Sequence, residues 1–262
     1  MHVLLPPSET KRAGGDGAAL ALDALALPGL RAAREAAIDA LVALCADEEA
    51  AAKALKLSAR QRGEIATNLV VREAPTMPAV DRFTGVLFDA LDAGSLDEGA
   101  RGWLSSHALI QTALLGPVRA SDPLPAFRLS AGHRLPGLPT PVRHWSAAAA
   151  SALGEELDAF ALDLRSEAYR ALAPLPAETS SVYVRVVTES TDGAVRALNH
   201  FNKKAKGQLA RALAETRCTA RDVAELTEWG AEAGFAFRAA EADGEVLLVA
   251  RDDAPAARAR AA

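Results

Sequence analysis

Cysteine is scarce in this sequence, and the two that occur, Cys45 and Cys218, lie far apart and form no C-x-x-C pair. Such sparing use provides neither a disulfide framework nor a zinc site, and it is typical of the reducing cytoplasm. Long apolar runs are also missing. No stretch approaches the roughly 18 residues that a membrane span needs, and no basic segment followed by an apolar one opens the chain. We therefore expect a cytoplasmic protein without a membrane segment.

Common catalytic and metal-binding motifs are absent as well. The five histidines show no H-x-x-x-H or H-x-x-E-H spacing, and there is no G-x-S-x-G elbow. Neither G-x-G-x-x-G nor G-x-x-x-x-G-K-[ST] occurs, so the sequence supports no dinucleotide site and no P-loop. We expect no metal, no cofactor and no identifiable catalytic residue, which favours a binding protein over an enzyme.

Hydrophobic residues make up 50% of the 262 positions, which is enough for a sizeable core. The formal net charge is −5, and this argues mildly against a surface coated in positive charge. It does not exclude a local basic groove, because binding of polyanions depends on where the charges lie.

The order of apolar patterns and turn signals predicts a mixed α/β (α+β) fold: a mixed sheet surrounded by helices, without regular βαβ repetition. Turns at Thr191-Asp192-Gly193 and Ala242-Asp243-Gly244 predict two hairpins. We expect one domain over residues 1–250 and a flexible tail over 251–262. The predicted strands are 2–5, 107–113, 126–130, 159–164, 181–189, 194–198, 235–238 and 245–250, and the predicted helices are 30–45, 47–57, 58–70 and 144–153.

Lysine is rare but clustered. Only six lysines occur, and Lys203, Lys204 and Lys206 fall within four positions. No acidic residue lies between Asp192 and Glu215, whereas exposed helix faces normally alternate acids with bases. Helical spacing gives this segment an apolar face and an opposite basic face.

An ordinary solvated surface remains one interpretation of that basic face, but its uncompensated charge favours an anion. Gly207 lies in the middle of the predicted helix, where glycine costs about 1 kcal/mol relative to alanine. It would permit close approach by a phosphodiester backbone or by a neighbouring chain segment.

Two other segments add polar and basic side chains. The residues after the first strand, Ser8 to Lys11, stand where ligands often bind, although a polar loop after a proline-terminated strand explains them equally well. Between Leu104 and Gly154 the single acidic residue is Asp122. The four arginines there are Arg119, Arg128, Arg134 and Arg143.

Several motifs, taken in order, resemble the YaaA family of bacterial peroxide stress proteins. The family's first strand and S-P-x-K-T-like loop are similar to residues 4–11, and its G-x-L-R-P-x-D and P-Y-R-L-x-x-G motifs resemble 116–122 and 125–132. Its N-L-A-S-x-E-Y pattern is similar to 163–169, and F-Y-A-K-K-A-R-G is similar to 201–207. The resemblance extends to about residue 213.

The resemblance implies a mixed α/β domain with a positively charged cleft that binds double-stranded or junction DNA, and a role in limiting damage from iron and peroxide. Members are said to carry a helix-hairpin-helix element. In this chain it would fall within 47–70, around Leu57 to Gly63, where the usual Leu-Pro-Gly-Ile-Gly-like hairpin is absent.

We therefore predict sequence-independent binding of the DNA backbone in a basic cleft, as part of the response to hydroperoxide. One alternative is an enzyme acting on a phosphorylated or nucleotide-like small molecule, with Ser8, Glu9, Ser166 and Glu167 as polar site residues. Another is an interaction protein whose basic face meets an acidic partner chain. The predicted DNA or phosphate contacts are Lys203, Lys204, Lys206, Arg211, Lys11, Arg119, Arg128 and Arg134.

Overall fold

The computed structural model describes residues 1–189, 195–196 and 199–250. An eight-stranded mixed sheet forms its centre, with the order β4-β3-β1-β6-β7-β10-β9 and β8 paired to β7. The strands are β1 (His2–Leu5), β3 (Ala108–Gln111), β4 (Pro117–Arg119), β6 (Ala161–Asp163), β7 (Ser181–Glu189), β8 (Val195–Arg196), β9 (Ala236–Ala239) and β10 (Glu245–Ala250). A separate two-stranded sheet pairs β2 (Met77–Pro78) with β5 (Pro123–Leu124).

Five strands of the large sheet run in the same direction. β1 is parallel to both β3 and β6, β6 is parallel to β7, and β7 is parallel to β10. Every residue of β1, β3 and β6 is buried, as expected of parallel strands covered on both faces. β4, β8 and β9 are antiparallel to their neighbours, so the mixed α/β fold expected from the sequence is confirmed.

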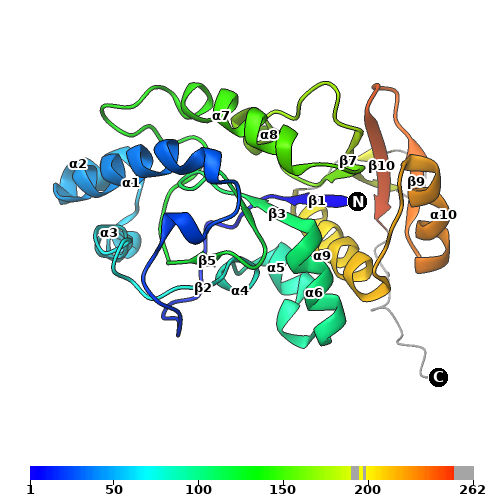
Figure 1. The fold of residues 1–262 in the computed structure, drawn as a ribbon, viewed down its shortest axis with the longest axis horizontal. Helices are drawn as coiled ribbons and strands as arrows, with labels where there is room; N and C mark the ends of the chain where they lie inside the picture. Colours follow the sequence, from blue (N-terminus) through cyan, green and yellow to red (C-terminus); the bar gives the residue numbers. More distant parts are fainter. Residues whose placement is uncertain (190–194, 197–198, 251–262) are drawn as a thin grey trace.

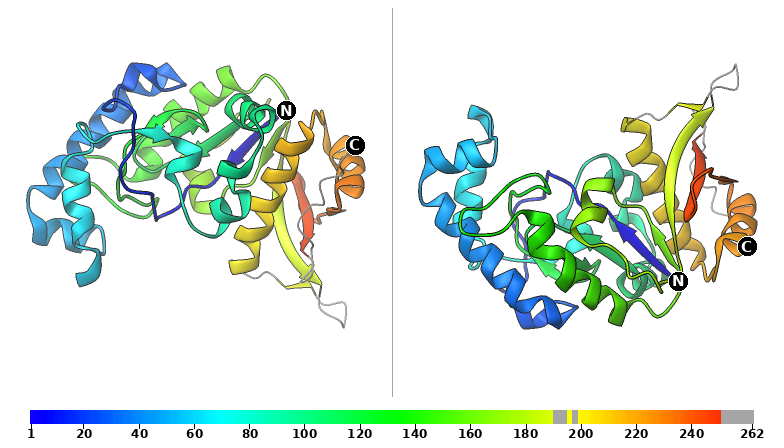
Figure 2. Two further views of the ribbon diagram at one scale, coloured as in Figure 1. Left: turned by 90° about the horizontal axis from the view of Figure 1, so that it is seen from below. Right: turned by 90° about the horizontal axis from the view of Figure 1, so that it is seen from above.

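Helices cover the two faces of the sheet and extend beyond it. In Figure 1, α7 and α8 lie along one side, and α5, α6 and α9 lie along the other. Both views of Figure 2 place α1, α2 and α3 at one end of the molecule, with β9, β10 and α10 at the opposite end. The helices are α1 (Arg31–Cys45), α2 (Glu48–Ala54), α3 (Gly63–Leu69), α4 (Ala79–Arg82), α5 (Val86–Leu91), α6 (Glu98–His107), α7 (Pro141–Glu156), α8 (Glu167–Leu172), α9 (Asn199–Thr216) and α10 (Val223–Ala233).

Local signals account for several element boundaries. The side chain of Thr140 accepts a hydrogen bond from the backbone N–H of Arg143, and Pro141 begins α7. Gly234 adopts a left-handed conformation (φ 85°) directly after α10 and ends it. The hairpin predicted around Ala242-Asp243-Gly244 is confirmed by the antiparallel pairing of β9 with β10.

For the hairpin predicted around Thr191-Asp192-Gly193, the structure describes the two strands but not the turn. β8 pairs with β7 through Thr188 and Glu189, as the hairpin prediction requires. The Thr191-Asp192-Gly193 turn and the tail over 251–262 lie outside the described residues. The assignment of residues 1–250 to one domain stays a prediction.

The strand predicted over residues 126–130 is wrong, because this segment is irregular. Its backbone is paired with a side chain. The N–H of Arg128 donates to Asn68 Oδ1 at 2.7 Å, and Asn68 Nδ2 donates to the carbonyl of Arg128 at 3.0 Å. A single amide thus satisfies both backbone groups that a neighbouring strand would otherwise have paired.

Candidate functional site

The loop after β1 and the segment after β6 meet at one edge of the sheet. β1 and β6 are adjacent and parallel, so their carboxyl ends, which lead into Ser8–Lys11 and Leu164–Ser166, lie side by side. Ligands in sheets of this kind bind beyond the carboxyl ends of the strands. The polar residues predicted for the site therefore lie at this edge of the sheet: Ser8, Glu9, Ser166 and Glu167.

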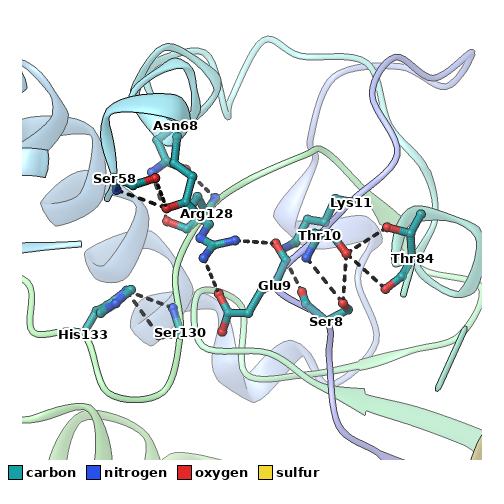
Figure 3. Close-up of polar contacts among 11 residues, drawn as sticks. Ser8, Glu9, Thr10, Lys11, Ser58, Asn68, Thr84, Arg128, Ser130 and His133 are labelled. Atoms are coloured by element: carbon teal, nitrogen blue, oxygen red, sulfur yellow. Dashed lines mark hydrogen bonds and ion pairs between the residues drawn. The ribbon is translucent and has the colours of Figure 1, made fainter. Parts of the chain in front are cut away.

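Glu9 and Arg128 connect the loop after β1 to the irregular segment over 126–130 (Figure 3). Arg128 Nη2 lies 3.3 Å from Glu9 Oε2, and Nη1 donates to the backbone carbonyl of Glu9 at 3.2 Å. The Nε of Arg128 is buried and has no hydrogen-bond partner among the described residues. Because Asn68 holds the Arg128 backbone from α3, three segments that are distant in sequence position this guanidinium.

Lys11 ends the same loop, and its amine is bonded to the backbone of the loop. Its Nζ donates to the carbonyls of Ser8 at 3.1 Å and Glu9 at 3.4 Å. The ring centroids of Phe127 and Phe83 are 4.5 and 5.2 Å from Nζ. Burial lowers the pKa of Lys11 to about 8, and the nearby Glu9 carboxylate partly opposes this shift.

Two further titratable side chains border the Glu9–Arg128 pair. Burial raises the pKa of the Tyr169 phenol on α8, and the neighbouring Glu9 raises it further. Burial also lowers the pKa of His133, whose Nδ1 lies 3.2 Å from the Ser130 hydroxyl (Figure 3). Both groups are therefore neutral at pH 7, and the local charge is set by Lys11, Glu9 and Arg128.

A second basic cluster surrounds Tyr183 on β7. The ring centroid of Tyr183 is 4.1 Å from the guanidinium carbon of Arg170 and 5.3 Å from Lys206 Nζ. Lys206 is 4% exposed, and its Nζ donates to the carbonyl of Arg165 at 3.4 Å. Burial lowers the pKa of Lys206 to about 8. Asp163, the nearby carboxylate, accepts hydrogen bonds from Arg165 Nε at 2.9 Å and Nη2 at 2.8 Å.

Lys203 and Lys204 are exposed on α9 and form no ion pair with any carboxylate of the described residues. The first turn of α9 contains no acidic residue, so nothing there offsets the positive end of the helix. The buried positions on this helix include Ala205, Leu209 and Leu213, so the predicted apolar face is confirmed.

Gly207 serves helix packing. A Cβ at this position would lie 2.1 Å from the carbonyl oxygen of Leu87 in α5. Of the two explanations considered for this glycine, close approach by a neighbouring chain segment is the one that the geometry fits.

The remaining predicted contacts are dispersed. Register places Arg119 opposite Leu109, near the amino end of β3, and Arg119 is paired with Glu156 at the end of α7. Arg119 therefore lies away from the carboxyl edge that carries Lys11. Arg211 donates to the Asp92 carbonyl at 3.0 Å and lies 2.9 Å from Glu215.

Three other predicted residues are exposed. Arg134 follows His133 in the irregular segment, and Ser166 precedes α8. Glu167, in the first turn of α8, lies 3.5 Å from Arg185 Nη1 on β7. Of the predicted basic residues, the site at the carboxyl edge thus contains Lys11 and Arg128 in one cluster and Lys206 in the other.

Sequence reasoning missed Asn68, whose role depends on a contact across 60 positions. It also missed three exposed basic residues around the connection between α2 and α3: Lys53, Lys56 and Arg60. The two short helices predicted within 47–70 are confirmed, and Ser58 and Gln61 form a reciprocal cap between them. The resemblance had pointed to this segment, but its basic residues are spaced too widely to form a recognisable cluster.

Two small cavities and the two cysteines lie outside the basic clusters. The larger cavity, of about 60 Å³, is lined by residues that include Pro78 and Arg101, and the smaller, of about 20 Å³, is lined by Leu129, Ser130 and His133, which follow Arg128 in the chain. Both cysteines are buried, and burial raises the pKa of each thiol. A peroxide-sensing cysteine needs an accessible thiolate, which neither environment favours.

Within the residues that the structure describes, no group of three or more His, Cys, Asp or Glu side chains is placed to hold a metal ion. No helix in the same part of the chain is long and apolar enough to cross a membrane.

Comparisons with known proteins agree with the motif pattern. A UPF0246 protein of Streptomyces coelicolor is 43% identical over 243 residues, covering 91% of this chain and 92% of its own. A UPF0246 protein of Corynebacterium efficiens is 41% identical over 253 residues, covering 95% and 99%. Residues 1–241 match the family described as peroxide stress protein YaaA. The chain belongs to this peroxide stress family.

Proposed function

We propose that this protein binds the sugar–phosphate backbone of double-stranded or junction DNA in the cytoplasm, as part of the response to peroxide. The observation that carries the proposal is the exposure of Lys203 and Lys204 without a carboxylate partner among the described residues. Exposed lysines are normally interleaved with acids, and phosphates are the anions that such unpaired ammonium groups attract.

Two further sets of basic residues extend the proposed contact. The exposed Arg134 belongs to the irregular segment, in which Arg128 is paired with Glu9, and Lys53, Lys56 and Arg60 surround the α2–α3 connection. Lys206 is too deeply buried to meet a duplex directly, and we assign it to supporting α9. Tyr183, the aromatic ring that Lys206 approaches, is also buried, so base stacking is not part of the proposal.

An enzyme acting on a small phosphorylated molecule would need an enclosing pocket around Lys203, Ser8 and Arg128. Neither of the two cavities described above is lined by Lys203, Ser8 or Arg128. An open basic surface fits an extended polyanion better than a small metabolite, because each phosphate adds one more weak contact.

The proposal is tested by measuring the affinity for two 20-base-pair duplexes of unrelated sequence at low salt. The double variant Lys203→Ala with Lys204→Ala is expected to lose affinity on the order of tenfold or more for both duplexes alike, because two phosphate contacts are lost. Its control, Arg217→Ala with Arg221→Ala, also removes two positive charges, but these arginines are paired with Asp97 and Glu225. No measurable binding by the unsubstituted protein, or equal losses in the two double variants, would refute the proposal.

A further inference from the structure

The amine of Lys11 is held differently from a solvated surface lysine. Its two hydrogen bonds go to backbone carbonyls, those of Ser8 and Glu9. No carboxylate of the described residues lies within ion-pairing distance of Nζ. The rings of Phe83 and Phe127 lie close to it. The loop therefore orients this nitrogen without neutralising it.

The two hydrogen bonds can be made by a neutral amine, whereas the rings of Phe83 and Phe127 favour the ammonium. A neutral amine has two N–H groups, and these can donate to the two carbonyls. Its one lone pair then remains available to attack an electrophile. The charged groups that act on Lys11 are Glu9 and Glu64, which favour the ammonium, and Arg128 and Arg82, which oppose it. Burial outweighs them and lowers the pKa of Lys11 to about 8, so roughly 10% of the side chains are uncharged at pH 7. A nucleophilic lysine requires such a neutral fraction.

Accessibility separates Lys11 from Lys206, whose pKa burial also lowers to about 8. Lys206, on α9, is 4% exposed, and its amine faces the Tyr183 ring and the Arg165 carbonyl, so a substrate cannot reach it. Lys11 is half-buried, and Glu9 and Thr10 in the same loop are exposed. Figure 3 shows these residues next to one another. Arg128, beside Glu9, has an Nε without a partner among the described residues.

We propose that Lys11 forms an imine with the aldehyde of a sugar phosphate, and that this aldehyde is the open-chain deoxyribose of an abasic position in DNA. The Nζ lone pair attacks the aldehyde carbon, and a proton moves from nitrogen to the former carbonyl oxygen. Loss of that hydroxyl as water, with the second nitrogen proton, leaves a C=N bond. The reaction consumes one amine and one aldehyde and releases one water, without an oxidant or reductant.

The inference rests on the proposed function, because an abasic position can meet Lys11 only within a strand that the protein binds. Oxidation of deoxyribose and loss of bases leave such aldehydes in DNA, so this chemistry suits a family that responds to peroxide. Glu9 and Thr10, which precede Lys11 in the loop, are exposed. This position at the surface favours an aldehyde within a strand over a free sugar phosphate, which would be held better in an enclosed pocket.

Borohydride trapping tests the proposal on the full-length protein. A duplex with one abasic position is incubated with the protein and sodium borohydride, which reduces an imine to a stable amine, and the modified lysine is located by peptide mass spectrometry. With six lysines in the chain, the assignment is unambiguous. The adduct is expected on Lys11, absent from Lys11→Arg and retained in Lys53→Arg, since Lys53 is an exposed lysine on α2.

Mapping on the unsubstituted protein keeps the test valid if Lys11→Arg does not fold. No adduct, or an adduct spread over Lys203 and Lys204, overturns the proposal. The trapping is repeated with glyceraldehyde 3-phosphate in place of the abasic duplex. If Lys11 forms an adduct with this aldehyde but not with the duplex, DNA is refuted as the source of the aldehyde. Binding of an intact duplex is measured in the same preparation. Failure of duplex binding with retained trapping of glyceraldehyde 3-phosphate would thus refute the proposed function separately from the amine chemistry.

Discussion

Asp163 and Arg165 show how single residues shape the site. Both side chains are almost fully buried, and the carboxylate also accepts a hydrogen bond from the backbone N–H of Arg165 at 3.0 Å. Arg165 Nη1 donates to the carbonyl of Ala173 at 2.7 Å, which ties the end of β6 to the residue after α8. The carbonyl of Arg165 in turn accepts the Lys206 amine. One ion pair therefore connects three elements around the sheet edge.

Asp163→Asn should destabilise the protein strongly. The substitution leaves the Arg165 guanidinium buried without its counter-charge, which typically costs about 3–5 kcal/mol in the free energy of unfolding. Asp23→Asn is the matched control, because its pair with Arg31 is exposed and such pairs contribute about 0–1 kcal/mol. Urea denaturation measures both. Equal, small losses for the two variants would show that the buried pair is not needed for stability.

Lys206 should make the stability depend on pH. Its pKa of about 8 lies below the ordinary value of 10.5, so the unfolded chain binds more protons between these two values. The cost of burying the ammonium is full below pH 8 and is relieved as the pH rises toward 10.5.

Lys206→Met should therefore be more stable than the unsubstituted protein at pH 7, and this advantage should shrink by about 2.5 kcal/mol by pH 10. Denaturation at both pH values measures the difference, and the other titrating groups cancel in the comparison. A difference that does not change with pH would contradict the assignment of a buried ammonium.

Residue-level prediction from the sequence succeeded where the signal was local. The exposure of Lys203 and Lys204 followed from helical spacing and from the missing acids. The burial of Lys206 and the role of Asn68 could not be predicted, because each depends on segments far away in the chain. Gly207 correctly indicated a close approach to the middle of the helix, but the sequence alone could not decide whether a ligand or a neighbouring helix makes that approach.

At the scale of elements, α9 is held by α5 through a close backbone approach. The first residues of α9 carry Lys203 and Lys204, so the position of α5 sets where these lysines stand. α9 also contacts α6, β7 and β10, which explains why it is buried on more sides than a single apolar face predicts.

Gly207→Ala should weaken this packing. The added methyl group would meet the Leu87 carbonyl at 2.1 Å, so α5 and α9 must separate, and overpacking of this kind costs about 1–3 kcal/mol. Gly102→Ala in α6 is the matched control, because nothing lies within 4 Å of its Cβ position. There, helix propensity should stabilise the protein by up to about 1 kcal/mol. Thermal unfolding distinguishes the two, and stabilisation by Gly207→Ala would contradict the packing role.

Elements were predicted best where one pattern dominated. The apolar run of β1, the alternating strand β7 and the hairpin of β9 and β10 were all confirmed. The strand expected over 126–130 failed because Asn68, on another element, satisfies the backbone of Arg128. No local pattern encodes that competition.

At the scale of the whole molecule, the topology gathers chemistry at one edge of the sheet. The parallel pairing of β1 with β6 brings Lys11 and Asp163 to the same edge, although they are 152 positions apart in the sequence. Arg119, which the sequence grouped with Lys11, lies toward the other end of β3 because β4 is antiparallel to it. Although the net charge is −5, the exposed Lys203 and Lys204 lie together on α9 and have no carboxylate partner among the described residues.

The most direct test of DNA-backbone binding is the salt dependence of duplex affinity. For the unsubstituted protein, log K should fall linearly with log salt, with a slope of roughly −0.9 for each phosphate neutralised. The double variant Lys203→Ala with Lys204→Ala should show a slope smaller in magnitude by about 2, whereas Arg217→Ala with Arg221→Ala should leave it unchanged. An affinity that does not depend on salt, or a slope that the two lysines do not alter, would contradict the account.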